Sequence, residues 1–205
     1  MGEKKRGLDA AACEYLEQRY GGTFRYSAPW GSSYANKGIT KMLFASEELG
    51  SEVLVEVRRD NDGYVFRDNY LAVKYREKMA DAIQAVANEC FASAKVFYSI
   101  LIQTCSPELG ADASFAEYSA DAASGAAGTV AVSSDGFDES QVDDFTDSLS
   151  RAGLNAFLRF VVVDADQYEQ IDLAGVDQIV GTGAVLFFKV LNVSADTAAD
   201  HSQEG

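Results

Sequence analysis

Residues 52–66 read EVLVEVRRDNDGYVF, and this stretch decides the fold class. Its first half places valine at every second position, which is the period of a half-buried β-strand. The DNDG sequence at residues 60–63 predicts a tight hairpin turn, because Asn and Gly tolerate the positive φ angles of such turns. Residues 64–66 then return as the partner strand. We therefore expect an antiparallel meander in this part of the chain.

The residues before this hairpin predict a helix and two more strands. Apolar side chains recur at helical spacing over residues 8–20, and Gly21 and Gly22 end that helix. We expect the strands over residues 23–27 and 39–45. We expect the meander to pack against the first helix.

Helical and strand patterns alternate after the hairpin. We expect a long helix over residues 69–91, a central strand over 95–104, a short strand over 129–133, an acidic helix over 138–152, a buried strand over 155–163, a helical turn over 167–171 and a last strand over 184–193. Residues 107–128 are either a long loop or the seam between two lobes. The prediction is an α+β fold with mainly antiparallel sheets, packed by an N-terminal helix, a long central helix and a third, acidic helix.

Net charge differs between the two halves of the chain. Residues 1–100 hold 14 Lys and Arg against 14 Asp and Glu, whereas residues 101–205 hold 3 against 18, so the net charge of -15 belongs to the second half. An acidic surface repels nucleic-acid phosphates and anionic lipids, which leaves a protein or a cationic molecule as the expected partner. We expect either two lobes, 1–105 and 106–205 with a polar tail from residue 194, or one continuous domain.

The apolar runs of the sequence are shorter than the roughly 20 residues that a membrane helix needs. Lys4, Lys5 and Arg6 are followed by a charged helix and not by the apolar core of a secretory signal. The expected location at face value is the cytoplasm. If an upstream anchor or signal belongs to the protein, the expected location is outside the cytoplasm.

The only histidine, His201, lies in the polar tail. Sites that pair serine or cysteine with histidine, and multi-histidine metal sites, need an imidazole held by packing, so this position disfavours them. The three cysteines form no C-x-x-C pair and are interpreted as buried or half-buried structural thiols: Cys13, Cys90 and Cys105. Gly181 and Gly183 match the first two glycines of a dinucleotide-binding loop, but the third glycine is absent. We interpret them as a turn or bulge. No cofactor is expected.

Two carboxylates, Asp164 and Asp166, follow the predicted buried strand. Oxygen ligands of this kind hold magnesium or manganese, so one hypothesis is a carboxylate-dependent metal enzyme. The alternative is a solvated loop in which Asp166 caps the helical turn that follows. We favour the solvated loop, because no nucleotide-binding loop precedes the pair.

Aromatic residues gather on a strand and on the glycine-rich loop that follows it: Phe24, Tyr26, Trp30 and Tyr34. Aromatic side chains on a loop form binding rims for peptides, sugars or partner proteins, or else they cover a sheet. The leading hypothesis is a non-catalytic binding or interaction module, and this group is its first candidate surface.

The helix that ends in Tyr20–Gly21 and the sequence Asp68-Asn69-Tyr70 at the hairpin exit resemble a small domain found in uncharacterised proteins of Gram-positive bacteria. The resemblance covers about residues 8–100. It implies no activity. Many members of that group are membrane-anchored or exported, so the resemblance implies an envelope-associated domain as a further hypothesis.

Overall fold

The computed structural model describes residues 7–31, 38–61, 63–99, 104–121, 126–183 and 185–196. These residues form helices and two mainly antiparallel sheets, which confirms the predicted α+β class. The chain divides into two compact units, which we call the first unit (residues 1–75 and 102–113) and the second unit (residues 76–101 and 114–205). No helix within the described ranges is long and apolar enough to cross a membrane.

The first unit is built on a four-stranded antiparallel meander. Its strands follow one another in space as they do in sequence: β1 (Phe24–Pro29), β2 (Ile39–Ser46), β3 (Ser51–Asp60) and β4 (Gly63–Asp68). The predicted hairpin is confirmed, because Asp60 pairs with Gly63 across the turn. Gly63 has a φ of 147°, a value that residues with a Cβ rarely adopt. Asp62 lies outside the described residues.

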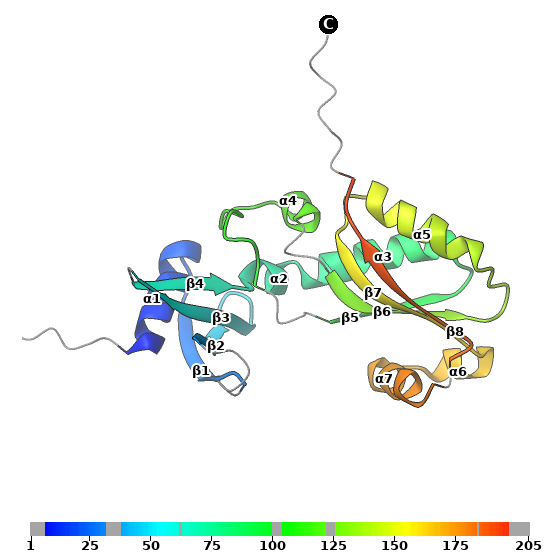
Figure 1. Cartoon of the computed structure of the whole chain (residues 1–205), viewed down its shortest axis with the longest axis horizontal. Coiled ribbons are helices and arrows are strands. Elements are labelled where there is room, and N and C mark those ends of the chain that lie inside the picture. Colours follow the sequence, from blue (N-terminus) through cyan, green and yellow to red (C-terminus); the bar gives the residue numbers. More distant parts are fainter. Residues whose placement is uncertain are drawn as a thin grey trace, which may run out of the picture. The chain divides into compact units, whose positions relative to one another are not determined.

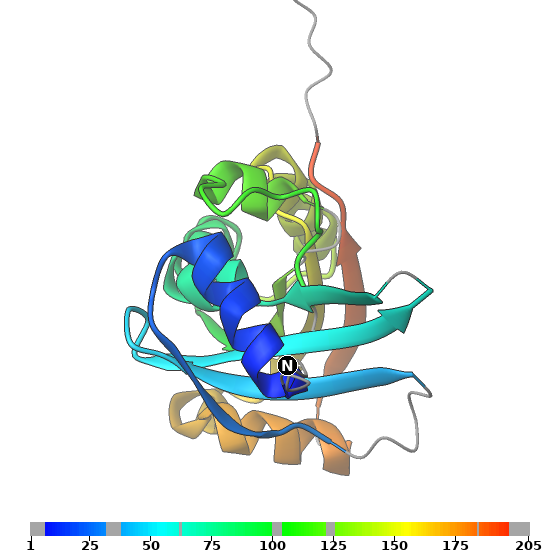
Figure 2. The ribbon, with the colours of Figure 1, turned by 90° about the vertical axis from the view of Figure 1, so that its left-hand side faces the viewer.

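Helix α1 (Leu8–Tyr20) crosses one face of this meander (Figure 2). Ala12 and Leu16 are fully buried, which confirms the predicted apolar stripe. Gly21 ends the helix in the left-handed conformation, and its N–H donates to the carbonyl of Glu17. The helix and the meander thus form the two layers of the first unit.

The predicted long helix is two helices. Helix α2 (Tyr70–Lys74) belongs to the first unit, and α3 (Arg76–Cys90) belongs to the second. Tyr75 lies between them outside helical geometry, and its hydroxyl donates to the carbonyl of Ala113 at 2.6 Å. This bond and the bond from the Cys105 N–H to the Asp68 carbonyl, at 2.8 Å, attach the segment 104–113 to the first unit.

The second unit contains a mixed four-stranded sheet. Its strands lie in the order β5 (Ala94–Ser99), β6 (Ala126–Ser133), β7 (Ala156–Val163) and β8 (Phe187–Val193). Only β6 and β7 are parallel, and helix α5 (Ser140–Arg151) makes the crossover that a parallel pair requires. The strand predicted as central, β5, lies instead at an edge of the sheet. Residues 100–103 of that prediction lie outside the described part of the chain.

Helices cover both faces of the second sheet (Figure 1). Helices α3 and α5 pack on one face, where the rings of Phe91, Phe145 and Phe160 lie 5.2–6.2 Å apart. Helices α6 (Ala165–Gln170) and α7 (Leu173–Thr182) pack on the other face, where Val161 and Val176 are fully buried. Each fully buried large apolar side chain contributes about 1.5–3 kcal/mol to folding.

Two helices of the second unit were not predicted. Helix α4 (Phe115–Ala120) lies within the segment interpreted as a loop or seam, and a capping box of Ser114 and Glu117 begins it. Helix α7 ends at the glycines interpreted as a turn or bulge, and Gly183 is its left-handed C-cap. The unit boundaries also differ from a division at residue 105, because β5 pairs with β6 and so belongs to the second sheet.

Candidate functional site

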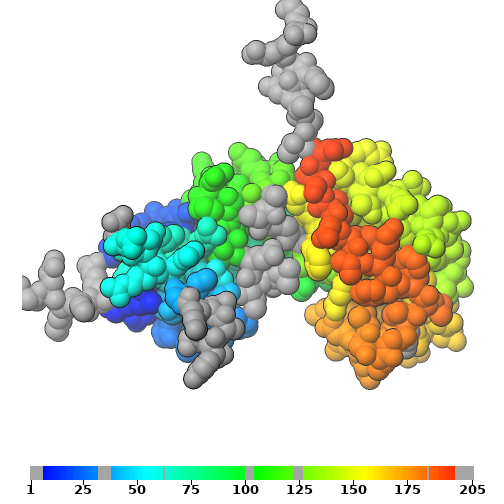
Figure 3. Space-filling view, in the orientation of Figure 1, coloured from blue at the N-terminus to red at the C-terminus, as the bar shows by residue number. Residues whose placement is uncertain are grey.

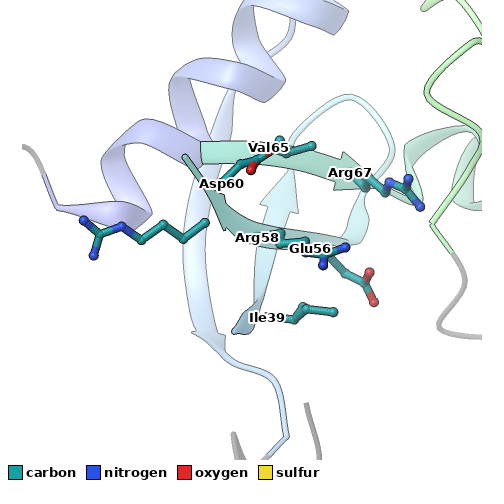
Figure 4. A pocket seen from close by; sticks show the side chains of 7 residues that line it. Ile39, Glu56, Arg58, Asp60, Val65 and Arg67 are labelled. Atoms are coloured by element: carbon teal, nitrogen blue, oxygen red, sulfur yellow. The ribbon is translucent and has the colours of Figure 1, made fainter. Parts of the chain in front are cut away.

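The first sheet has one face that α1 covers and one face that we call the open face. Asp68 accepts hydrogen bonds from the hydroxyls of Tyr15 and Tyr20 on α1, at 2.7 and 2.8 Å, so its side chain points toward α1. Side chains alternate between the two faces along a strand, so Arg67 projects from the open face. Figure 4 shows Arg67 and Glu56 projecting on the side away from α1.

The strand register fixes which side chains are neighbours on the open face. One row across β2, β3 and β4 contains Lys41, Glu56 and Arg67, and the next row contains Ile39, Arg58 and Val65. Directly opposed residues have Cβ atoms about 5 Å apart, so each row is in contact. Lys41 and Glu56 form an ion pair with each other. Arg58 and Arg67 are exposed, and neither has an ion-pair partner within the described residues.

These rows border a depression of about 410 Å³ (Figure 4). We call it the arginine pocket, and it is lined by Ile39, Glu56, Arg58, Arg59, Asp60, Val65 and Arg67. Its volume lies in the range of small-ligand sites. Its lining contains three arginines and two carboxylates, so the pocket has an excess of one positive charge. The pocket therefore suits a ligand group that carries negative charge.

Trp30 extends the first row of the open face. Its backbone N–H donates to the carbonyl of Lys41 at 2.9 Å, which continues the pairing of β1 with β2. The register sets Trp30 opposite Lys41 and therefore on the same face. Its side chain is 41% exposed. One of the predicted binding aromatics thus lies in the same row as Glu56 and Arg67, with Lys41 between it and Glu56.

The other predicted binding aromatics are placed differently. Phe24 is only 3% exposed, and its ring contacts Tyr70 edge-on in the core of the first unit. Tyr26 is 45% exposed and packs edge-on against Phe44. Tyr34 lies outside the described residues. Phe24 thus belongs to the core and not to a surface rim, whereas Tyr26 and Trp30 remain accessible.

The two carboxylates after β7 are both exposed. Asp164, not the expected Asp166, caps α6, because its side chain accepts the N–H of Asp166 at 3.0 Å. Asp166 lies in the first turn of that helix. In the ranges that the structure describes, no group of three or more His, Cys, Asp or Glu side chains is placed to hold a metal ion. His201 lies outside those ranges.

None of the three cysteines forms a disulfide. Cys13 and Cys90 are half-buried and Cys105 is buried. Burial raises the pKa of the Cys13 and Cys90 thiols, and nearby Glu17 raises that of Cys13 further. A raised pKa lowers the fraction of reactive thiolate, which fits the structural role expected for these residues.

A buried polar network around Asp68 was not predicted from the sequence. Besides the two tyrosine hydroxyls of α1, Asp68 accepts the N–H of Tyr70 at 2.9 Å. Burial, reinforced by Asp68, raises the pKa of both Tyr15 and Tyr20 above the ordinary value. Burial and a hydrogen bond to Glu48 raise the pKa of Tyr70 to about 12. The network joins α1 to the end of β4 and has a structural role.

Asp68 and Asn69 directly precede α2. Asn69 occupies the N-cap position of α2, but its side-chain oxygen accepts the N–H of Leu54 at 2.7 Å. The ring of Tyr70 stacks on that of Tyr20, with centroids 3.9 Å apart. The Asp-Asn-Tyr sequence therefore closes the junction between α1, β3 and β4, and the Asp68 side chain also accepts the N–H of Tyr70, the first residue of α2.

Fold and site together define an α+β protein with a cationic depression on an open sheet face. A comparison of the chain with protein-family models, with curated proteins and with solved structures found no significant match in any of the three.

Proposed function

We propose that this protein is a non-catalytic binding module whose arginine pocket takes up a carboxylate-bearing segment of a partner protein. The observation that carries this proposal is the pair Arg58 and Arg67, two exposed guanidinium groups without an ion-pair partner among the described residues. They flank Glu56, whose charge is already engaged by Lys41. The two arginines therefore remain available to an external anion.

Arginine suits this task better than lysine. Its planar guanidinium group donates two parallel hydrogen bonds to one carboxylate, which adds direction to the charge attraction. Arg58 and Arg67 lie on adjacent strands and in adjacent rows, so their guanidinium groups can approach one ligand from two sides. Such an arrangement favours a ligand with a defined orientation over a diffuse cloud of counterions.

The apolar residues around the arginines indicate what accompanies the carboxylate. Ile39 and Val65 line the pocket, and Trp30 lies at the far end of the neighbouring row. Tryptophan and arginine are enriched among the residues that dominate binding energy at protein interfaces. The proposed ligand is therefore an acidic side chain or a chain terminus flanked by apolar residues, and not a bare inorganic anion.

The proposal is tested by calorimetric titration with a short peptide in which glutamate and leucine are mixed. We expect binding that weakens as salt is added, because exposed charges are screened. Arg58→Gln and Arg67→Gln are each expected to weaken binding roughly tenfold, which corresponds to about 1.4 kcal/mol. Arg25→Gln is the matched control, because Arg25 is an exposed arginine of the same sheet that is paired with Glu47.

Inorganic phosphate serves as the competing probe in this titration. Phosphate that binds as tightly as the peptide would show that the pocket recognises charge alone and would contradict the proposed partner. An Arg25→Gln variant that loses as much affinity as Arg58→Gln would show general charge attraction. Either result would overturn the assignment of the site.

A further inference from the structure

A second surface of the molecule lies in the second unit and does not depend on the arginine pocket. Strand β8 is the last strand in the order of the second sheet, so one of its edges is not paired with any strand in the described part of the chain. Beyond β8 the chain turns onto α5, where the Asp196 N–H donates to the carbonyl of Ser150. Figure 3 shows the atoms of β8, in orange-red, at the surface of this unit.

Strand β8 carries exposed apolar side chains on the face of α6 and α7. Phe188 is 45% exposed and Val190 is 44% exposed. They lie opposite Val161 and Arg159 of β7, and Val161 belongs to the core beneath α6 and α7. Exposed Phe157 lies on the same face of β7, two residues before Arg159. An apolar strip therefore continues from β7 to the unpaired edge.

The opposite face of the same edge lies against helix α5, which carries several carboxylates. Lys189 points toward α5, where its ammonium group lies 3.0 Å from Asp143. The hydroxyl of Ser150, two helical turns further along α5, donates to the carbonyl of Ser194. Asp147 lies between these two contacts at helical spacing, so it also faces β8, and it has no ion-pair partner within the described residues.

The second unit as a whole carries a large excess of acidic residues. Its sequence contains 6 Lys and Arg against 19 Asp and Glu, whereas the first unit contains 11 against 13. A second copy of the chain approaching β8 would bring a similar acidic unit close to this one. A basic segment of another protein would meet an attractive potential instead.

We propose that the free edge of β8 takes up an extended segment of a partner protein in which apolar and basic residues alternate. An added strand forms backbone hydrogen bonds along the edge and places successive side chains on opposite faces. The apolar side chains of the segment cover Phe188 and Val190, and a basic side chain reaches Asp147 of α5. Long apolar edge strands are rarely left uncovered in natural sheets, because they pair readily with other chains.

The probe for this proposal is a short, end-blocked peptide of alternating valine and lysine, titrated by fluorescence anisotropy. Two control peptides separate strand addition from charge attraction. One has the same composition with valine and lysine in separate blocks, and the other carries N-methyl groups on alternate backbone amides. We expect both controls to bind at least about tenfold more weakly than the alternating peptide.

Variants of the protein locate the site. The double variant Phe188→Ser with Val190→Ser, and the single variant Asp147→Asn, are each expected to lower the affinity for the alternating peptide roughly tenfold. The matched control is Tyr64→Ser, which removes an exposed aromatic side chain from the edge strand β4 of the other sheet. We expect that control to bind the peptide as the wild type does. Circular dichroism confirms that each variant is folded.

Several outcomes would overturn the proposal. They are failure of the alternating peptide to bind, equal binding of the block peptide, and equal loss of affinity in the β4 control. A dimer in light scattering that the Phe188→Ser and Val190→Ser variant dissociates would assign the edge to a second copy of the chain. Protection of the β8 amides from hydrogen exchange when the peptide is added would support strand addition directly.

Discussion

Asp68 joins helix α1 to the end of strand β4 in the first unit. It is 3% exposed and accepts hydrogen bonds from two hydroxyls of α1 and from the backbone of Tyr70. A buried carboxylate is tolerated only where hydrogen bonds replace the lost water. The two α1 tyrosines therefore stabilise the protein in two ways. Their hydroxyls donate hydrogen bonds to the buried Asp68 carboxylate, and their rings bury apolar area.

Replacing Tyr20 with phenylalanine tests this role. The substitution keeps the stacked ring but removes one donor to Asp68, so we expect a loss of about 1–3 kcal/mol in the free energy of unfolding. Denaturant unfolding followed by circular dichroism measures the loss. Tyr64→Phe, at an exposed tyrosine of β4, is the control and should change the free energy of unfolding little. A Tyr20→Phe variant as stable as the wild type would contradict the role given to the network.

The same network predicts how stability depends on pH. The pKa values of Tyr15, Tyr20 and Tyr70 are raised above the ordinary value of 10.0, to about 12 for Tyr70. Above about pH 10 the unfolded chain loses these protons while the folded protein keeps them. The unfolded state then binds fewer protons, so the free energy of unfolding falls as the pH rises.

Denaturant unfolding at a series of pH values measures this dependence. We expect a steady fall in the free energy of unfolding between about pH 10 and pH 12. The fall should be shallower in Tyr20→Phe, which has one tyrosine fewer to keep protonated. A wild-type protein whose stability is unchanged across this window would contradict the proposed cause.

At the scale of elements, local patterns predicted the helices and strands that bury one face. The alternating valines of β3 and the helical stripe of α1 are dictated by burial, so their period was visible in the sequence. The break at Tyr75 was not visible, because it depends on a hydrogen bond to Ala113, 38 residues away. Helix α7 was missed because Gly175 and Gly181 lower its apparent helix propensity.

Two glycines of the second unit differ in the space around them. A Cβ on Gly128 in β6 would lie 2.7 Å from the carbonyl oxygen of Phe97 on the neighbouring strand. A Cβ on Gly181 in α7 would meet no atom within 4 Å. Gly128 is therefore required by a close approach of two strands, whereas Gly181 is not.

We predict opposite effects of alanine at these two positions. Gly128→Ala should lower the free energy of unfolding by about 1–3 kcal/mol, because β5 and β6 must move apart. Gly181→Ala should raise it by up to about 1 kcal/mol, because alanine favours the helix and creates no clash. Denaturant unfolding of both variants measures the difference. A Gly128→Ala variant as stable as Gly181→Ala would show that the two strands do not approach so closely.

The candidate site was only partly predictable for a related reason. The sequence named Trp30 as a candidate binding aromatic, but it singled out neither Arg58 nor Arg67. Their position on one face follows from the β3–β4 register and from the face that α1 occupies. The spacing of the two arginines in the sequence reveals neither the strand register nor the face that α1 covers. The long-range contact between Asp68 and Tyr15 of α1 shows which face of the sheet α1 covers.

At the scale of the whole molecule, the two units carry different charge. The cationic pocket lies in the nearly balanced first unit, and the edge of β8 lies in the acidic second unit. The two proposed surfaces therefore select partners of opposite charge. Added salt should weaken binding at both surfaces, because both rely on exposed charges.

Trp30 is the only tryptophan in the chain, so its fluorescence reports on the open face of the first sheet. The most direct test of the central claim is to titrate the glutamate–leucine peptide while recording this emission. We predict a saturable change in the wild type and in Arg25→Gln, and no change at the same peptide concentrations in a variant that combines Arg58→Gln with Arg67→Gln. Two results would contradict recognition at the arginine pocket. One is an unchanged emission in the wild type although calorimetry shows that the peptide binds. The other is an equal change of emission in the double variant.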